Sequence, residues 1–147
     1  SSSSFQIDEI YDAMSQLGLL PRDPLVVTSL NLDHKNIGVQ GKVGILALLL
    51  QHLPSLTYLD FSFNEINDKG MEMLCPALQR LSSLTFLDLS SHLIKVEGTN
   101  KLAHSLQHLR SLTPLNLGSH QIGDGIKIIA PALSHLVSLT FLDLSYN

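Results

Sequence analysis

Residues 56–66 read LTYLDFSFNEI, and the spacing of apolar residues in this stretch returns at four other places along the chain. Leu56, Leu59 and Phe61 occupy positions 1, 4 and 6 of the unit, and Ile66 occupies position 11. The five copies begin at Val27, Leu56, Leu84, Leu112 and Leu139. Successive starts lie 29, 28, 28 and 27 residues apart. A fixed period of this length predicts a solenoid, in which each unit buries its apolar face only against its neighbours.

Each unit combines a strand pattern with a helix pattern. Its start alternates apolar and polar residues, as in Leu87-Asp88-Leu89, which predicts a short strand with one buried face. A glycine follows position 11 in the first four units, at Gly41, Gly70, Gly98 and Gly125. Apolar residues then recur at helical spacing, as in residues 71–81. One strand and one helix per unit predict an α/β array with a parallel sheet inside a curve and helices outside.

The pattern L-x-x-L-x-L-x-x-N-x-I of residues 56–66 resembles a leucine-rich repeat, and a length of 28–29 residues with a helix is similar to the ribonuclease-inhibitor-like subclass. The resemblance covers about residues 25–147 and is specific, because the pattern recurs five times in phase. It implies a curved leucine-rich repeat solenoid that serves as a scaffold for protein–protein binding. Position 9 departs from the family pattern, since asparagine stands there only at Asn64 and Asn147.

The other three copies carry Lys35, His92 and His120 at position 9. A histidine can supply one donor in place of the asparagine amide, and Lys35 is expected to point outward with Asn36 as its substitute. His92 and His120 would stand about 5 Å apart on adjacent strands. Two stacked imidazoles disfavour double protonation, which predicts a local stability that depends on pH. The alternative is that both histidines only replace asparagine in the ladder.

Residues 1–24 form a tail and a helical segment ahead of the array at residues 25–147. Apolar residues within 5–19 fall at helical spacing. Gly18 predicts the helix end, and Pro21 and Pro24 prevent the helix from resuming. We expect this helix to cap the open end of the first repeat, since solenoids require polar-faced end units for solubility. The alternative is a partner-binding helix fused to the array.

Bulk properties exclude several classes of protein. The 147 residues suffice for one domain, and a hydrophobic content of 44% argues against disorder. A net charge of -4 with scattered Lys and Arg argues against nucleic acid as the partner. The sequence contains no run of about 18 apolar residues, the length that predicts a membrane-spanning helix, so no membrane partner is expected. One cysteine, no Asn-X-Ser/Thr site and no signal-peptide pattern favour a reducing, cytoplasmic setting.

No residue pattern predicts catalysis or a metal site. The sequence has no nucleophile–base motif, phosphate-binding loop or set of metal ligands. His104 and His108 would share a helix face, but no third ligand accompanies them. Cys75 falls at a repeat position that otherwise holds alanine, which predicts a buried thiol in close helix–sheet packing. We therefore predict a protein that is not an enzyme and holds no cofactor or metal.

Two prolines modify the predicted helices. Pro76 and Pro131 follow the small residue in the second and fourth copies. Proline inside a helix removes a hydrogen bond and kinks the helix. We therefore expect these two helices to be short and less regular than those of the first and third copies, with the proline in the first turn.

The sheet face of the predicted curve carries the candidate binding site. Positions 2, 3, 5, 7 and 8 of each unit are expected to point outward from this concave face. Rings at positions 3 and 8 stand beside carboxylates and amides at position 5, a mixture that suits a partner protein with a basic surface. The predicted partner-binding residues are Tyr58, Asp60, Phe63, Phe86, Asp88, Asn116, Phe141, Asp143 and Tyr146. The simpler interpretation is that Asp at position 5 only solvates the face.

Two other functions are compatible with the same repeat type. One is a regulator of a small GTPase, resembling the GTPase-activating proteins of Ran, although no local motif carries a catalytic residue over. The other is the sensor region of a larger immune-receptor or effector protein. Residues 139–147 lack the pattern of a terminal cap, so we expect a continuation of the chain, a covering partner, or edge-to-edge self-association there.

Overall fold

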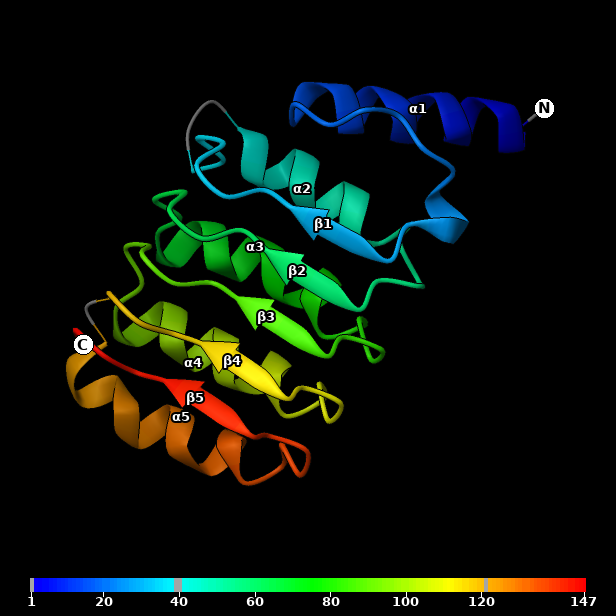
Figure 1. Ribbon diagram of the computed structural model, residues 1–147. Coiled ribbons are helices and arrows are strands. Elements are labelled where there is room, and N and C mark those ends of the chain that lie inside the picture. Colours follow the sequence, from blue (N-terminus) through cyan, green and yellow to red (C-terminus); the bar gives the residue numbers. More distant parts are fainter. Residues whose placement is uncertain (1, 39–40, 121) are drawn as a thin grey trace.

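The protein is an array of strand–helix units stacked in sequence order behind one N-terminal helix (Figure 1). The computed structural model describes residues 2–38, 41–120 and 122–147. The strands are β1 (Ser29–Asn31), β2 (Tyr58–Asp60), β3 (Phe86–Asp88), β4 (Pro114–Asn116) and β5 (Phe141–Asp143). The helices are α1 (Ser2–Gln16), α2 (Lys42–Leu50), α3 (Asp68–Leu78), α4 (Val96–Leu106) and α5 (Ile126–Leu133). Two 3₁₀ turns are η1 (Pro24–Val26) and η2 (Gly123–Gly125).

The five strands form one parallel sheet in the order β1-β2-β3-β4-β5. Equivalent positions of neighbouring units stand opposite each other, so Leu59 pairs with Leu30 on one side and Leu87 on the other. The helices lie together behind the sheet (Figure 1). A helix is about 10 Å wide and strands lie about 4.8 Å apart, so the helix side is the longer arc and the sheet forms the concave face. The predicted α/β solenoid fold is confirmed.

The core lies between the sheet and the helices. Positions 1, 4, 6 and 11 point into it, and Phe61 at position 6 is the largest of the fully buried side chains. From the helix side, Leu46, Leu74 and Leu102 fill the same layer. Burial of a leucine-sized side chain contributes about 1.5–3 kcal/mol, so the repeating apolar positions are sufficient reason for the units to stack.

Threonines at position 2 add a side-chain ladder beside the backbone ladder. The Thr57 hydroxyl donates to the Thr28 carbonyl at 3.1 Å, and the Thr85 hydroxyl donates to the Thr57 carbonyl at 3.1 Å. Thr113 and Thr140 continue the series along β4 and β5. These hydroxyls therefore bind the neighbouring unit, although the sequence pattern indicated only that position 2 points outward.

Helix α1 packs against α2 and extends the core beyond the first repeat. Ile10, Met14 and Leu17 are buried in the common apolar cluster. The helix ends as predicted at Gly18, whose φ of +76° lies in the left-handed region. The Gly18 amide donates to the Ser15 carbonyl at 3.0 Å and the next amide to Met14 at 2.8 Å, which satisfies the last carbonyls of the helix.

The expectation for the prolines is wrong for α3 and holds in part for α5, which has only 8 residues and directly follows the 3₁₀ turn η2. In neither helix does the proline lie in the first turn. Pro76 lies in the last turn of α3, which has 11 residues, the same length as α4. Pro131 likewise lies toward the end of α5. Both prolines are exposed, and the carbonyl that Pro76 leaves without a donor belongs to Glu72, which is also exposed. Water can satisfy a carbonyl on that outer face, so the helix continues through the proline.

Gly38 sits where the first unit approaches the backbone of the second. A Cβ atom at this position would collide with the backbone carbonyls of Asn64 and Glu65. We expect Gly38→Ala to lower the free energy of unfolding by about 1–3 kcal/mol, the usual cost of overpacking. Gly44→Ala in α2 is the matched control, because its Cβ would meet only the flexible end of Met73. That variant should gain about 0.5–1 kcal/mol from helix propensity. Urea unfolding of both variants checks the opposite signs.

Candidate partner-binding surface

The predicted binding residues lie in rows across the sheet, because the strands are in register. Tyr58 pairs with Phe86 in the position-3 row, which Pro114 and Phe141 continue on β4 and β5. The position-5 row contains Asp60, Asp88, Asn116 and Asp143. Phe63 and Tyr146 occupy position 8, just beyond β2 and β5. The structure thus brings all nine predicted residues to one surface, although Tyr58 and Tyr146 stand at opposite corners of it.

Two pairs of aromatic rings stack on this surface. The rings of Tyr58 and Phe86 lie 4.2 Å apart between centroids and within 8° of parallel. The rings of His34 and Phe63 lie 4.5 Å apart and within 9° of parallel. His34 was not among the predicted binding residues, but its place at position 8 of the first copy is the signal that could have found it. Stacked pairs hold rings in fixed orientations, which lowers the conformational entropy lost when a partner binds.

The position-5 side chains have a structural role as well as a surface one. Asp60 Oδ1 accepts hydrogen bonds from the Ser62 backbone amide at 3.0 Å and from the Ser62 hydroxyl at 2.7 Å. Asp88 makes the same two bonds with Ser90. Asn116 forms the same kind of turn with the Gly118 amide at 2.9 Å. These bonds use only Oδ1, so the second carboxylate oxygen of each aspartate is available to a partner.

The expectation that position 7 points outward is wrong for three of the copies. Ser62 and Ser90 are 4% and 7% exposed, and Gly118 is also buried. The serine hydroxyls turn toward the position-5 carboxylate of their own unit, and this hydrogen bond compensates for the loss of contact with water. Asp33, at position 7 of the first copy, differs because its carboxylate lies 3.3 Å from His34 Nδ1.

Position 8 has a left-handed backbone in every copy. Phe63 and Tyr146 have φ values of +57° and +58°, and they are 51% and 87% exposed. The other position-8 residues share this conformation, at His34, Ser91 and Ser119. Such a φ is unusual for a bulky residue. The turn lifts the two aromatic side chains out of the surface at its rim.

The concave face is electrostatically one-sided. Positions 5 and 7 hold Asp33, Asp60, Asp88 and Asp143, and none of the Lys and Arg residues stands at positions 2–8 of a described strand unit. Burial raises the pKa of Tyr58, and the nearby carboxylates of Asp60, Asp88 and Asp33 raise it further. Hydrogen bonds from Ser145 lower the pKa of Asp143. Arg22 lies beside β1, where its Nη2 donates to the Ser29 carbonyl at 3.4 Å.

Beneath the surface, asparagine at position 9 bonds neighbouring units. Asn64 Nδ2 donates to the carbonyls of Leu32 at 2.8 Å, Phe61 at 2.8 Å and Ser62 at 3.0 Å. Its Oδ1 accepts from the amides of Lys35 at 2.8 Å and Ile37 at 3.2 Å. Asn147 repeats the pattern on the fourth copy.

The histidines that replace asparagine at position 9 make fewer hydrogen bonds than Asn64 does. His92 Nδ1 accepts from the Ile66 amide at 3.0 Å, and His120 Nε2 lies 2.6 Å from the Leu89 carbonyl. Their second ring nitrogens, His92 Nε2 and His120 Nδ1, are buried without a hydrogen-bond partner among the described residues. Lys35 points outward as predicted, but Asn36 is also exposed and does not replace the missing amide.

The two imidazoles stack as expected, with centroids 5.7 Å apart and planes within 16°. Both side chains are more than 95% buried. Burial lowers the pKa of His92 to about 3, helped by the adjacent His120 and opposed by the Phe61 carbonyl. Burial also lowers the pKa of His120, against the Leu89 and His92 carbonyls and the Asp88 carboxylate. Both rings are therefore neutral at neutral pH.

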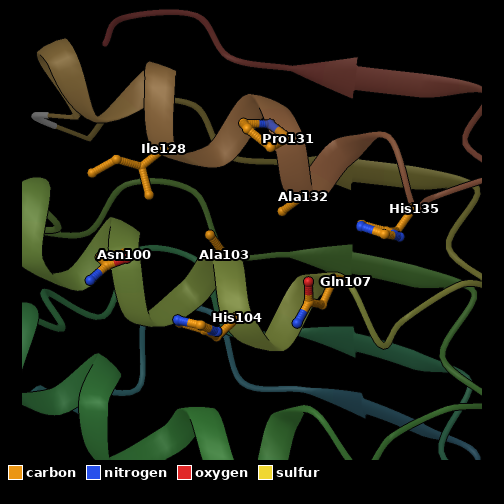
Figure 2. A pocket seen from close by; sticks show the side chains of 8 residues that line it. All are labelled: Asn100, Ala103, His104, Gln107, Ile128, Pro131, Ala132 and His135. Carbon is orange, nitrogen blue, oxygen red and sulfur yellow. The ribbon is translucent and has the colours of Figure 1, made fainter.

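The helix side holds a shallow hollow between α4 and α5, of about 190 Å³. In Figure 2 the apolar side chains of Ala103, Ile128 and Ala132 lie between the two helices, with Asn100, His104, Gln107 and His135 around them. Within the described ranges, no group of three or more His, Cys, Asp or Glu converges on a metal-sized site. Cys75 is buried as predicted, and burial raises its thiol pKa, which suppresses its reactivity.

Across the described residues, no helix is both long and apolar enough to span a membrane.

Comparisons with known proteins agree with this architecture. The family model described as "Leucine Rich repeat" matches residues 52–75 and 107–126. A structure of actin-binding site 2 of leiomodin-1 superposes with a TM-score of 0.68 at 17% identity, covering 93% of this chain and 77% of that one. The tropomodulin C-terminal domain of Caenorhabditis elegans superposes with a TM-score of 0.72 at 15% identity, covering 91% and 83%. A comparison with curated proteins finds no match.

The superpositions extend over nearly the whole chain, while the family match covers the first part of the second and fourth copies and the few residues before each. At such low identity the two structures establish the shared fold and leave the function open. Together with five in-phase copies and the parallel sheet, these findings show that the chain has the leucine-rich repeat fold, with a helix in each complete repeat as in the ribonuclease-inhibitor-like type.

Proposed function

We propose that the chain is a non-enzymatic protein-interaction module that binds a partner protein on its concave face. The observation that carries this proposal is the combination of two fixed ring stacks with four carboxylates and no cation at positions 2–8 of the described units. Exposed aromatic anchors beside charged groups are typical of residues that dominate binding energy at interfaces.

The size of the surface is compatible with this role. Five strands at about 4.8 Å spacing give a sheet about 20 Å wide. A standard interface takes about 800 Å² from each partner, which this face and its rim can supply. The leiomodin-1 structure is that of an actin-binding site. Actin is therefore the first candidate partner to test for this chain.

We also propose that α1 serves as the cap of the array and that residues 25–147 form the binding unit. The burial of Ile10, Met14 and Leu17 against the first repeat supports the capping role. The carboxylates of Asp8, Glu9 and Asp12 stay exposed on the other side of the helix. Such an arrangement covers apolar surface with a polar face, as terminal units of solenoids do.

A triple variant at the centre of the concave face tests the binding prediction. Each new residue is one that the chain already has in the same row of the sheet, so that the fold is kept. Tyr58→Ser and Phe86→Ser copy Ser29, and Asp88→Asn copies Asn116. We expect the triple variant to lose at least about tenfold in affinity for a partner, since a few central anchors carry most of the binding energy. Isothermal titration with purified actin, or with a partner first identified by cross-linking, measures the change.

The control places two changes on the helix side, His104→Ala and Gln107→Ala, both at the α4–α5 hollow. Circular dichroism should show that both proteins remain folded. If the sheet variant keeps full affinity while the helix-side variant loses it, the binding surface lies on the convex side and the proposal fails.

A further inference from the structure

The position-3 row of rings is open at one end. The Tyr58 and Phe86 rings lie 4.2 Å apart and nearly parallel, and their strands are direct neighbours. Strands in a sheet lie about 4.8 Å apart, so the two rings stack along the direction that crosses the strands. Each ring therefore presents its second face to the next strand. For Phe86 this is the side of Pro114, whereas for Tyr58 it is the side of Ser29, which is small and exposed.

Because serine carries no ring, the position-3 row has a gap on the β1 side of Tyr58, at Ser29. Its polar neighbours come from the position-5 row, where Asn31 pairs with Asp60 two residues further along the strands. Asp60 uses Oδ1 to hold its own turn, which leaves the second oxygen for a ligand. Asp33 adds a further carboxylate on the β1 side, and its charge reaches the Tyr58 ring.

We propose that this gap, here called the Ser29–Tyr58 slot, receives an arginine side chain of the partner protein. The guanidinium would stack on Tyr58 in continuation of the ring row and donate hydrogen bonds to the free oxygen of Asp60. A guanidinium is planar and weakly hydrated, so it fits a gap between a ring and a neighbouring strand better than a compact ammonium does. This inference rests on the proposed use of the concave face and names the partner chemistry at its centre.

Arg22 of the chain itself does not occupy this position. Its guanidinium donates to the Ser29 carbonyl, and on β1 that carbonyl belongs to the strand edge that has no neighbouring strand. The slot lies on the other side of Ser29, between β1 and β2. Arg22 therefore shows that a guanidinium is accommodated at the outer edge of β1.

The test uses a small probe and the full chain. We would titrate the ¹⁵N-labelled protein with the capped peptide acetyl-Gly-Arg-Gly-amide and follow the amide shifts of Ser29, Tyr58 and Asp60 by NMR. Saturable shifts confined to β1 and β2 are expected, with a dissociation constant on the order of millimolar for a single anchor. The lysine peptide should bind roughly three- to tenfold more weakly, and the citrulline peptide, which has no charge, should produce no saturable shift.

Three variants distinguish binding in the slot from general attraction to the acidic face. Ser29→Phe should abolish binding, because a third ring fills the gap, and the row accepts phenylalanine at Phe86 and Phe141. Ser29→Ala should bind as the natural chain does. Asp60→Asn should weaken binding by roughly three- to tenfold, the loss of one charge-assisted contact, while keeping its turn as Asn31 and Asn116 do.

The proposal is overturned if the arginine peptide gives no saturable shift, if the citrulline peptide binds equally, or if Ser29→Phe leaves the affinity unchanged. A failure of this kind is distinct from failure of the proposed function. In that case the triple variant of the concave face would still lose its partner, and only the arginine slot would be rejected.

Discussion

Replacement of Asn64 by alanine is expected to lower the free energy of unfolding by about 3–5 kcal/mol, the range seen when several buried hydrogen-bond partners lose their donor or acceptor together. The side chain is 1% exposed and makes five hydrogen bonds. Alanine cannot replace any of them, so the Lys35 and Ile37 amides and the Leu32 carbonyl would lose the bonds that Asn64 makes to the first copy. The Ser62 carbonyl would keep its bond from the His34 amide. This loss of stability exceeds that caused by removing a typical methylene from the core, because backbone groups on two units lose hydrogen bonds at once.

Urea unfolding followed by circular dichroism measures this change. Asn64→Asp tests which part of the amide matters, since a carboxylate still accepts from Lys35 and Ile37 but places a negative charge against three carbonyl oxygens. We expect a loss nearly as large as for alanine. Asn100→Ala on the exposed face of α4 is the control and should change stability by no more than about 0.5 kcal/mol. A loss below 1 kcal/mol for Asn64→Ala would show that the ladder contributes little.

Acidification is the second large effect. The pKa of His92 falls from 6.5 to about 3 in the folded protein, and the pKa of His120 is also lowered. The unfolded chain therefore binds more protons than the folded one below pH 6.5, so stability is fully present above that pH and declines as the pH falls. Below pH 6.5 the slope approaches about 1.4 kcal/mol per pH unit for His92, and His120 adds to it in the same direction. Between pH 8 and pH 5, His92 alone should account for about 2 kcal/mol.

Chemical denaturation at half-unit steps from pH 8 to pH 5 measures this decline. The double variant His92→Asn and His120→Asn should have a much flatter profile, because asparagine does not titrate and is the residue that Asn64 and Asn147 already use at this position. The matched control replaces His104 and His135 by asparagine, two exposed residues on the helix side, and should keep the natural slope. An unchanged slope in the His92/His120 variant would show that other groups cause the acid sensitivity.

The fold was predictable from the sequence because its determinants repeat. Positions 1, 4 and 6 are apolar in all five copies and position 11 is isoleucine in the first four, and this repetition leaves one architecture that buries them together. Gly18 marked the end of α1 for a similarly local reason, since a left-handed residue is needed there. The prediction for Pro76 failed because the cost of a proline in a helix depends on whether the carbonyl that loses its donor can bind water. Pro76 faces outward, and the carbonyl that it leaves without a donor belongs to the exposed residue Glu72.

The candidate surface was predictable in position but not in detail. Register placed Tyr58 beside Phe86, and the alternation of the strand placed both on the sheet face. The sequence did not reveal that Ser62 turns back to Asp60, because an isolated serine pattern does not distinguish a surface hydroxyl from one bonded to its neighbour. The pairing of His34 with Phe63 was also missed, since it depends on left-handed turns at position 8 that bring two rings together across adjacent copies.

The strictly sequential order of the sheet has a consequence for how such a surface can diverge. Each strand contacts only the strands before and after it, and it contributes one side chain to every row of the concave face. A substitution in one row is therefore felt by two neighbours at most, while the buried positions that set the curvature are untouched. The binding surface can therefore change one strand at a time. New binding specificity can accumulate through single substitutions, each of which leaves a sequence that still folds.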